Sequence, residues 1–313
     1  MKYSITATIL FMLPLTLHAA PIVPTTPAQS TKIIIDTDIG DDIDDAYALA
    51  LACSLPNVKL LGVTTMFGET HKRAMLAAKL LQRAGHANIP VIAGIPGPSK
   101  MGLQQEWAQN FNSSAIRKED VTAFMQRMIL QNPKEITIVG IGALTNIAAL
   151  ITEHPDIKAK IKNIVIMGGS VYRGYAPGSK PEPEWNIRCD PAAAKIVFTS
   201  GIPLTMAGLE VTAMMQLDTD KQKLIFEKGS PLTDALAALT ALWGGGTPTL
   251  YDPVATAWAL GYHFADSEED HVVVEDDGST HIVYGTPNCT VLINPRKDEF
   301  LNWYVQAVGK LHQ

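Results

Sequence analysis

Short runs of apolar, β-branched residues alternate along the chain with segments whose apolar residues recur at helical spacing. The apolar runs predict strands at Lys32–Asp36, Val58–Thr65, Ile89–Ala93, Glu135–Val139, Asn163–Met167 and Ile202–Ala207. The segments between them predict helices at Asp45–Ser54, Thr70–Ala84, Asp120–Leu130, Leu144–Thr152 and Pro191–Thr199.

The predicted strands are apolar on both faces, which is typical of parallel strands that helices cover on both sides. Because these strands alternate with amphipathic helices, the pattern predicts an α/β fold with a mainly parallel central sheet. Ligands of such sheets bind outside the carboxyl ends of the strands. We therefore expect the functional residues at those ends.

The first predicted strand runs directly into an acidic turn, KIIIDTDIGDDIDDA at residues 32–46. Six of the ten residues from 36 to 45 are aspartates, namely Asp36, Asp38, Asp41, Asp42, Asp44 and Asp45. Two carboxylates about 4 Å apart repel each other by roughly 4 kcal/mol at an effective dielectric constant near 20. The turn therefore predicts that protons or a cation lie among these carboxylates.

Several kinds of local structure would explain aspartates at such a turn. Helix capping explains one or two of them, because a helix start offers few free N–H groups. A hard cation explains more, since Ca²⁺ takes 6–8 oxygen ligands, whereas zinc prefers His and Cys, which the turn lacks. An EF-hand would need a preceding helix and a closing Glu. A strand followed by DxD also resembles haloacid-dehalogenase-type phosphatases, which have Thr or Val where Ile39-Gly40 stands here.

Three later segments place unusual residues beside predicted strand ends and helix starts. The segments ITIVGIGALTN and IVIMGGS each end a predicted strand in glycines. A long Gly/Pro-rich loop then carries Glu184, Trp185 and Asn186 shortly before a predicted helix, and loops longer than about 12–15 residues are usually functional or disordered. Near the C-terminus, LWGGGTPTLYDP places Asp252 at another helix start.

Taken together and in this order, the motifs resemble the inosine–uridine-preferring nucleoside hydrolase family. The segment IIIDTDIGDDIDDAYALALA is similar to its N-terminal signature, and the likeness continues through LLGVTTMFGET, TIVGIGALTNIA, IVIMGGS, EWNIRCDPAAA and YDPVATAWAL. The resemblance implies a single-domain nucleoside-hydrolase-type fold over residues 32–313. It also implies hydrolysis of the N-glycosidic bond of ribonucleosides to free base and ribose, with one Ca²⁺ that holds water and ribose hydroxyls.

The resemblance implies which residues bind the metal. Asp38 matches the aspartate that binds the metal and takes a proton from the attacking water. Asp45 and Asp252 match further metal ligands, and the backbone carbonyl of Ile141 matches a carbonyl ligand. Asp36 is expected to support the metal ligands from behind, as partners of metal ligands commonly do.

Other residues of the matched motifs are expected to bind the sugar. Asp44 matches a ribose-binding carboxylate, and Glu184 with Asn186 match groups that grip the sugar hydroxyls. The acidic turn is two residues longer than the commoner DxDxGxDDA form. Asp41 and Asp42 are therefore alternatives to the ligands named above.

The contacts to the base are expected to differ from the commoner form of the family. Glu69 stands where the family often has Asn and is assigned to the substrate site. Tyr251 stands where the family often has a His that protonates the leaving base. Some relatives without that His stack the purine on aromatic rings, so Tyr251, Trp185 and Trp243 are candidates, with core packing as the alternative. His71, at the start of a predicted helix, is a further candidate.

Composition narrows the choice of partner. The chain has 313 residues, 25 of them basic and 31 acidic, for a formal net charge of −6. It contains no basic tract, which argues against nucleic acid and leaves a small-molecule nucleoside as the expected partner. The resemblance also suggests a homodimer or homotetramer.

Two other functions fit the same motifs. One is hydrolysis of another N-ribosyl compound, such as nicotinamide riboside or a modified nucleoside. The other is a non-catalytic ribose- or nucleoside-binding protein. Retention of Asp38 favours an enzyme, because a binding protein needs no base for water.

The first residues carry the pattern of an export signal. Lys2 precedes the apolar stretch Ile5–Leu17, and small residues follow it, so residues 1–20 read as a signal peptide and the protein as secreted or periplasmic. An uncleaved anchor is the alternative, but the apolar stretch is shorter than the roughly 20 residues that span a bilayer. Residues 21–31 read as a flexible lead-in, and no membrane partner is expected after cleavage.

Overall fold

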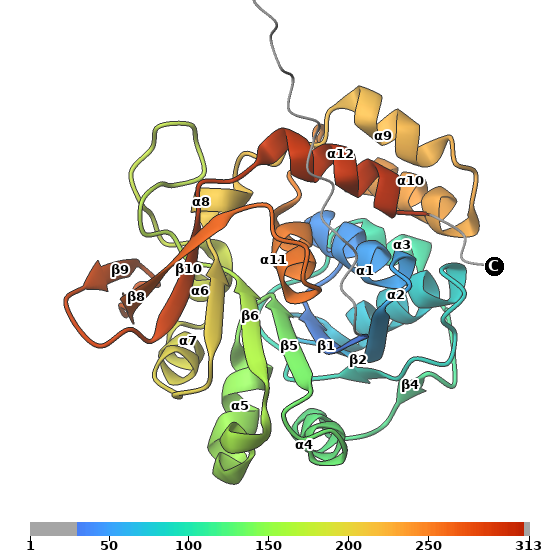
Figure 1. Cartoon of the computed structure of the whole chain (residues 1–313). Coiled ribbons are helices and arrows are strands. Elements are labelled where there is room, and N and C mark those ends of the chain that lie inside the picture. Colours follow the sequence, from blue (N-terminus) through green and yellow to red (C-terminus); the bar gives the residue numbers. More distant parts are fainter. Residues whose placement is uncertain (1–29, 310–313) are drawn as a thin grey trace, which may run out of the picture.

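A ten-stranded sheet runs through the middle of the described chain, in the order β4-β3-β2-β1-β5-β6-β7-β10-β8-β9 (Figure 1). The computed structural model describes residues 30–309, so the expected signal peptide lies outside the described residues. The strands are β1 (Thr31–Thr37), β2 (Val58–Thr65), β3 (Val91–Ala93), β4 (Ile116–Arg117), β5 (Ile136–Ile141), β6 (Asn163–Met167), β7 (Leu204–Ala207), β8 (Asp266–Val274), β9 (Thr280–Val283) and β10 (Cys289–Ile293).

Helices connect most of these strands. They are α1 (Asp44–Ser54), α2 (Thr70–Arg83), α3 (Gln104–Trp107), α4 (Val121–Gln131), α5 (Thr145–Glu153), the 3₁₀ helix η1 (Pro155–Lys160), α6 (Trp185–Cys189), α7 (Pro191–Phe198), α8 (Leu209–Thr212), α9 (Thr219–Phe226), α10 (Pro231–Trp243), α11 (Tyr251–Ala259) and α12 (Lys297–Ala307). Among the described residues, no helix is both long and apolar enough to cross a membrane.

The predicted, mainly parallel sheet is confirmed. Neighbouring strands from β4 to β10 all run parallel, whereas β8 pairs antiparallel with both β10 and β9. The pattern analysis did not predict β8, β9 and β10. The first half of β8, DSEED, carries four acidic residues, which conceal the alternation of apolar residues that identifies a strand.

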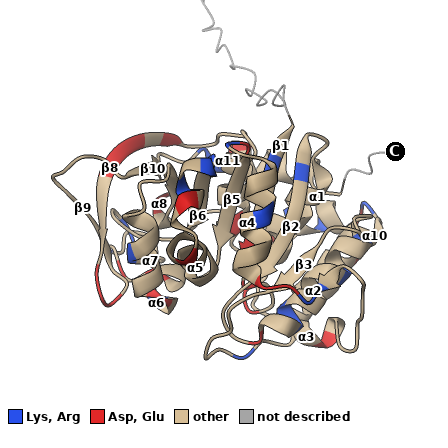
Figure 2. Cartoon of the chain, turned by 90° about the horizontal axis from the view of Figure 1, so that it is seen from below, with Lys and Arg blue, Asp and Glu red and all other residues tan. Residues whose placement is uncertain are grey.

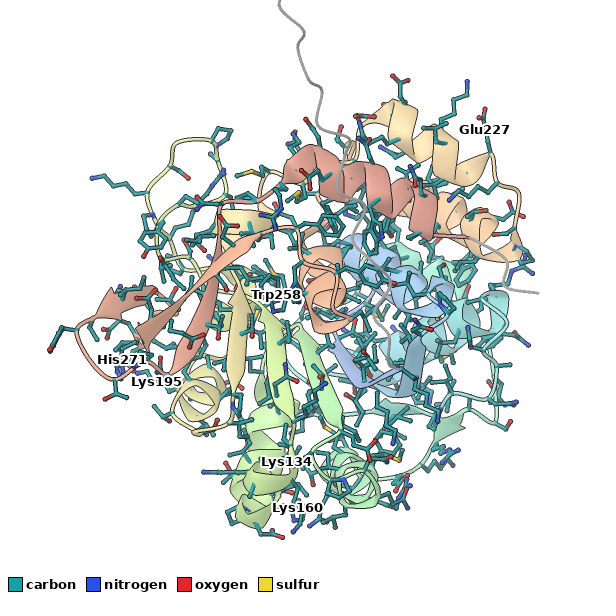
Figure 3. All side chains as sticks on the ribbon, in the orientation of Figure 1. Lys134, Lys160, Lys195, Glu227, Trp258 and His271 are labelled. Carbon is teal, nitrogen blue, oxygen red and sulfur yellow. The ribbon has the colours of Figure 1, made fainter. Side chains whose placement is uncertain are left out.

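Successive side chains of β1 point to opposite faces of the sheet and pack into two different hydrophobic cores. Ile33 and Ile35 belong to the core formed with α1, α2, α10, α11 and α12, whereas Ile34 belongs to the core formed with α4, α5 and α7. All three isoleucines are fully buried. Side chains fill the space on both sides of the sheet (Figure 3). The sheet is therefore covered on both faces, as its apolar strands predict.

The chain reverses its direction across the sheet beside β1. Strands β2, β3 and β4 lie on one side of β1, whereas β5 and the later strands lie on the other. Thr37 at the end of β1 is paired in register with Ile141 at the end of β5. In open α/β sheets this switch point forms a crevice at the carboxyl ends of the strands. The acidic turn enters that crevice.

A buried arginine fixes the backbone of the acidic turn. The side chain of Arg73, in α2, is fully buried and donates hydrogen bonds to the backbone carbonyls of Asp38, Ile39 and Phe67. Its Nη2 also pairs with Oδ2 of Asp41 at 2.7 Å. The planar guanidinium group can serve several acceptors at once, which the ammonium group of a lysine cannot do with the same geometry.

Replacing Arg73 should destabilise the fold far more than replacing another arginine of the same helix. We expect Arg73→Met to lower the free energy of unfolding by about 3 kcal/mol, because it leaves buried carbonyls and a carboxylate without their partner. The exposed Arg83 is the matched control, and Arg83→Met should change stability by no more than about 0.5 kcal/mol. Urea unfolding of both variants measures the difference, and equal losses would refute this role of Arg73.

Candidate active site

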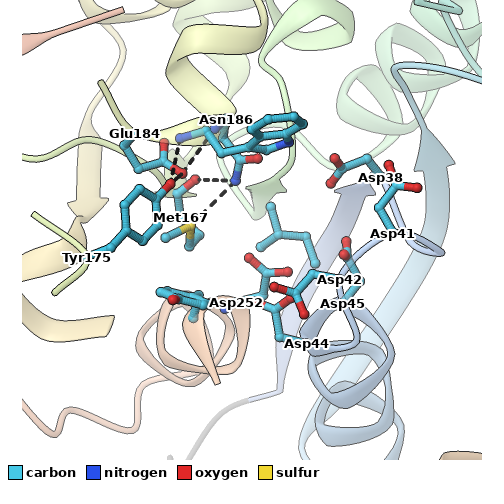
Figure 4. Close-up of a pocket in the computed structure, with 13 residues that line it drawn as sticks. Asp38, Asp41, Asp42, Asp44, Asp45, Met167, Tyr175, Glu184, Asn186 and Asp252 are labelled. Atoms are coloured by element: carbon cyan, nitrogen blue, oxygen red, sulfur yellow. Dashed lines mark hydrogen bonds between the residues drawn. The ribbon is translucent and has the colours of Figure 1, made fainter. Parts of the chain in front are cut away.

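A cavity of 190 Å³ opens at the carboxyl ends of β1, β5 and β6 (Figure 4). Its walls come from the acidic turn, the last residues of β5 and β6, the loop before α6, and the starts of α6 and α11. The lining residues are Asp38, Asp41, Asp42, Asp44, Asp45, Ile141, Met167, Tyr175, Glu184, Trp185, Asn186, Tyr251 and Asp252. Segments that lie far apart in the sequence thus build one cavity at the switch point.

Four of the predicted site residues do not line this cavity. Glu69 forms an ion pair with Lys72 at 2.6 Å at the start of α2. His71 is exposed and lines other hollows on the surface of α2. Trp243, the last residue of α10, packs against the larger core. Asp36 lies beneath the cavity and is fully buried.

Three carboxylates converge inside the cavity. One oxygen from each of Asp44, Asp45 and Asp252 lies within 4.8 Å of the others, and all three side chains are buried. The backbone N–H of Asp252 donates to Asp44 Oδ2 at 3.1 Å, and the hydroxyl of Thr37 donates to Asp45. The set expected from the resemblance contained Asp38 in the place that Asp44 takes here.

The converging carboxylates need a neutralising partner. Burial raises the pKa of Asp44, Asp45 and Asp252 well above the ordinary value, and repulsion from neighbouring aspartates raises it further. Burial also raises the pKa of Asp38 to about 6, although the positive charge of Arg73 opposes the change. A set of buried carboxylate oxygens is the donor chemistry that hard divalent cations prefer. The residues therefore fit a hard divalent cation.

The other two aspartates of the turn differ in their partners. Asp41 is held by Arg73 and also accepts a hydrogen bond from the backbone N–H of Gly102 at 3.2 Å. Its charge is therefore offset within the protein. Asp42 is exposed, and its carboxylate accepts the backbone N–H of Ile43 at 2.6 Å. The structure thus assigns Asp41 a structural contact and leaves Asp42 at the surface of the cavity.

A glycine makes room for Asp38. A Cβ atom at Gly142, just beyond β5, would lie 2.6 Å from Asp38 Oδ1 and 2.6 Å from the sulfur of Met66. Real Cβ atoms essentially never come so close to other heavy atoms, so any side chain at position 142 would displace Asp38 or Met66. Steric crowding by Asp38 and Met66 therefore explains why the segment ITIVGIG ends in glycine.

Glu184 and Asn186 form the wall opposite the acidic turn (Figure 4). Glu184 caps α6 and accepts the backbone N–H groups of Asn186 at 3.0 Å, Ile187 at 3.2 Å and Gly169 at 3.1 Å. Burial raises the pKa of Glu184 to about 7, despite these hydrogen bonds. The side-chain amide of Asn186 donates to the carbonyl of Met167 at 3.0 Å. Both side chains are therefore held in place before a ligand binds.

Aromatic side chains stand at the opening of the cavity. The rings of Tyr175 and Tyr251 meet edge to face, with centroids 6.1 Å apart and an interplanar angle of 77°. The hydroxyl of Tyr175 accepts the backbone N–H of Trp185 at 2.8 Å. Trp185 is 46% exposed, and the guanidinium group of Arg188 lies 5.0 Å from its ring centre. Tyr175 was not among the predicted site residues.

Asp36 ties β1 to its neighbours. One carboxylate oxygen accepts the hydroxyl of Thr64 in β2 and the amide of Asn146 in α5, the latter at 2.8 Å. The other oxygen is buried, and no described residue forms a hydrogen bond with it. Burial raises the pKa of Asp36 to about 7. Its hydrogen bonds thus serve the sheet, and none of those found in the described region joins it to a cavity carboxylate.

Comparisons with known proteins agree on one family. A family model described as inosine-uridine preferring nucleoside hydrolase matches residues 33–302. The pyrimidine-specific ribonucleoside hydrolase RihA of Shewanella sp. (strain MR-7) is 33% identical over 319 residues, covering 90% of this chain and 97% of that protein.

Solved structures share the same fold. The purine-preferring ribonucleoside hydrolase from Gardnerella vaginalis superposes with a TM-score of 0.77 at 24% identity, covering 88% of this chain and 98% of that one. The inosine-uridine preferring nucleoside hydrolase from Bacillus anthracis gives a TM-score of 0.77 at 22% identity, covering 90% and 100%. At these identities the likeness shows the fold alone.

The pKa of Asp36 predicts how the stability depends on pH. An unfolded aspartate ionises near pH 3.9, whereas folded Asp36 stays protonated up to about pH 7. Between these values the folded chain binds more protons, so this contribution to stability is complete below pH 4 and is lost as the pH rises to 7.

Asp36→Asn removes this titration while keeping an acceptor for Thr64 and Asn146. The free energy of unfolding of the variant minus that of the wild type should therefore increase by about 2 kcal/mol when the pH is raised from 5 to 8. Urea unfolding at both pH values, with saturating Ca²⁺ present, measures this change. A difference between variant and wild type that is the same at pH 5 and pH 8 would show that Asp36 is already ionised in the fold.

Proposed function

Because the chain belongs to the inosine–uridine preferring nucleoside hydrolase family, we propose that it hydrolyses the N-glycosidic bond of ribonucleosides and releases free base and ribose. One observation carries the proposal. Asp38, the three converging carboxylates and the Glu184–Asn186 pair line the same cavity, at the switch point of the sheet. This combination suits the binding of a polar sugar beside a base for water.

A divalent cation, calcium by resemblance to the family, completes the proposed site. Asp44, Asp45 and Asp252 would hold it, and Ile141, whose carbonyl the resemblance implies as a further ligand, lines the same cavity at the end of β5. When bound, the cation supplies positive charge that lowers the pKa of a bound water and orients the ribose hydroxyls.

Asp38 is the proposed general base. Its carboxylate lies in the cavity, and Arg73 fixes the carbonyl of the same residue. In the chain without a metal, burial raises the pKa of Asp38 above that of an ordinary aspartate, which makes its carboxylate a better proton acceptor. Asp38 would therefore accept one proton from the attacking water.

The opposite wall is proposed to bind the ribose. Glu184 and Asn186 are buried and held by backbone hydrogen bonds, so they can direct the sugar without further ordering. Departure of the base leaves positive charge on the ribosyl ring. The surrounding carboxylates stabilise that charge electrostatically, which lowers the barrier more than it stabilises the bound nucleoside.

The opening of the cavity faces the base. Tyr175, Trp185 and Tyr251 can stack against a heterocycle there. The names of the relatives cover both pyrimidine-specific and purine-preferring enzymes, so family membership does not fix the base. Export through the signal at residues 1–20 and assembly into a homodimer or homotetramer stay part of the proposal.

Nucleoside cleavage should require calcium and Asp38. With Ca²⁺ present, a reducing-sugar assay should detect ribose released from at least one of uridine, cytidine, inosine and guanosine, and a chelator should abolish the release. Asp38→Asn should lower kcat by about 10²-fold to 10⁴-fold, as loss of a general base does. The exposed Asp220→Asn serves as the control for loss of one carboxylate. A folded, calcium-loaded protein that releases ribose from none of the four nucleosides would refute the proposed function.

The choice between Asp44 and Asp38 as metal ligand can be tested directly. If the converging set binds the metal, Asp44→Asn and Asp252→Asn should each weaken Ca²⁺ binding about tenfold or more, and Asp38→Asn should weaken it less. Titration calorimetry of the chelator-treated variants measures the affinities. Weaker binding in Asp38→Asn than in Asp44→Asn would restore the ligand set implied by the resemblance.

A further inference from the structure

The segment at residues 99–104 packs against the acidic turn without lining the cavity. It runs into α3, which lies next to α2 (Figure 2). The backbone N–H of Gly102 donates to Asp41 Oδ1 at 3.2 Å. The methyl group of the buried Met101 occupies the place that a side chain at Gly40 would take. The segment therefore contacts two successive residues of the turn.

Gln104, the first residue of α3, reaches the backbone of the turn. Its side chain is fully buried, and its amide nitrogen donates to the carbonyl of Asp41 at 3.2 Å and to that of Asp42 at 2.8 Å. An amide group carries two N–H donors, so one side chain can hold two carbonyls at once. Gln104 thereby fixes the orientation of two successive peptide groups just before α1.

The start of α1 needs such support from outside. Ile43 stands at the N-cap position and makes no side-chain hydrogen bond to the helix, whereas Ser, Thr, Asp and Asn are the residues that cap helices well. The next two residues, Asp44 and Asp45, carry carboxylates that converge within 4.8 Å of each other and of Asp252. When no cation is bound, repulsion among ionised carboxylates would drive these side chains apart. Contacts outside the cavity therefore have to hold their backbone.

The oxygen of the Gln104 amide shows that packing alone does not explain this residue. Its Oε1 is buried, and no described residue forms a hydrogen bond with it. A buried acceptor without a partner lowers stability, and an apolar side chain of the same size would avoid that loss. The two hydrogen bonds to the turn are therefore the contribution that a glutamine makes here and an apolar residue could not make.

We propose that Gln104 is a positioning residue for the metal. By holding the two carbonyls of the turn, it directs Asp44 and Asp45 toward one another and thereby sets the affinity of the site for calcium. Ligands that are ordered before binding lose less conformational entropy when the metal arrives, so the site binds the metal more tightly. The inference rests on the proposed function and deepens it by naming a residue outside the cavity that prepares the metal site.

Calcium binding tests the role of Gln104. Gln104→Met keeps the length of the side chain and removes both donors, so it should weaken Ca²⁺ binding about tenfold, as the loss of a residue that orients metal ligands does. Titration calorimetry of the full-length, chelator-treated protein measures the affinity. Urea unfolding with and without saturating Ca²⁺ measures it independently, and the stabilisation by Ca²⁺ should fall by about 1.4 kcal/mol, the equivalent of a tenfold change.

The neighbouring glutamine is the matched control. Gln105 donates to the carbonyl of Met101 at 3.2 Å and accepts a hydrogen bond from Lys72 at 3.0 Å, and neither partner belongs to the turn. Gln105→Met therefore removes the same amide one residue away and should change the affinity by no more than about twofold. Gln104→His restores an N–H donor at nearly the same distance from the backbone and should recover most of the affinity.

Three results would overturn this role. They are wild-type affinity in Gln104→Met, an equal loss of affinity in Gln105→Met, and a loss in Gln104→His as large as that in Gln104→Met. A loss of stability that is the same with and without Ca²⁺ would likewise show that Gln104 supports only the fold. If Gln104→Met does not fold, the smaller Gln104→Ala replaces it with the same expected loss of affinity.

Failure of this inference differs from failure of the proposed function. In each of the results above, the wild type still binds Ca²⁺ and cleaves nucleosides. A wild-type protein that binds no Ca²⁺ would overturn the metal site of the proposed function, and the role of Gln104 with it.

Discussion

The mutual repulsion of the aspartates after β1 is the constraint on which the site depends. The fold meets it with different partners at different depths. Asp36 is stabilised by Thr64 and Asn146, and Asp41 by the guanidinium group of Arg73. The converging carboxylates of Asp44, Asp45 and Asp252 accept at most single hydrogen bonds and form no ion pair with any described residue, and their pKa values are raised accordingly. A bound cation is therefore the remaining way to ionise them.

The local pattern of the sequence predicts much of the architecture. Strands β2 and β6 have the bounds expected from their apolar runs, because strands of a covered parallel sheet read as near-continuous apolar segments. The antiparallel edge from β8 to β10 was missed, since DSEED reads as a solvated segment. The position of that strand is set by pairing with β10, a long-range contact that no local pattern contains.

The sequence predicts the types of residue in the candidate site better than it predicts their contacts with one another. The crowding of aspartates pointed to the right turn, but Arg73 lies in an ordinary amphipathic helix and carries no signal in the sequence. Only the packing of α2 against the turn shows that Arg73 holds Asp41. Likewise, Glu69 follows a strand end but turns toward Lys72. The spacing of residues along the sequence predicts which of them come near the crevice. The direction in which each side chain points depends on the partners that it finds in the fold.

Stability and function are coupled at this site by the same charges. The buried aspartates destabilise the fold when ionised without a counter-charge, because burial removes their hydration. A cation that binds only the folded chain reverses this cost and stabilises the fold by mass action. The ionised carboxylates that it creates are also the groups that can accept a proton or stabilise a ribosyl cation. A chain optimised for stability alone would replace the buried aspartates of the cavity, so chemistry explains the presence of Asp38, Asp44 and Asp45, whereas Asp36 and Asp41 have structural partners.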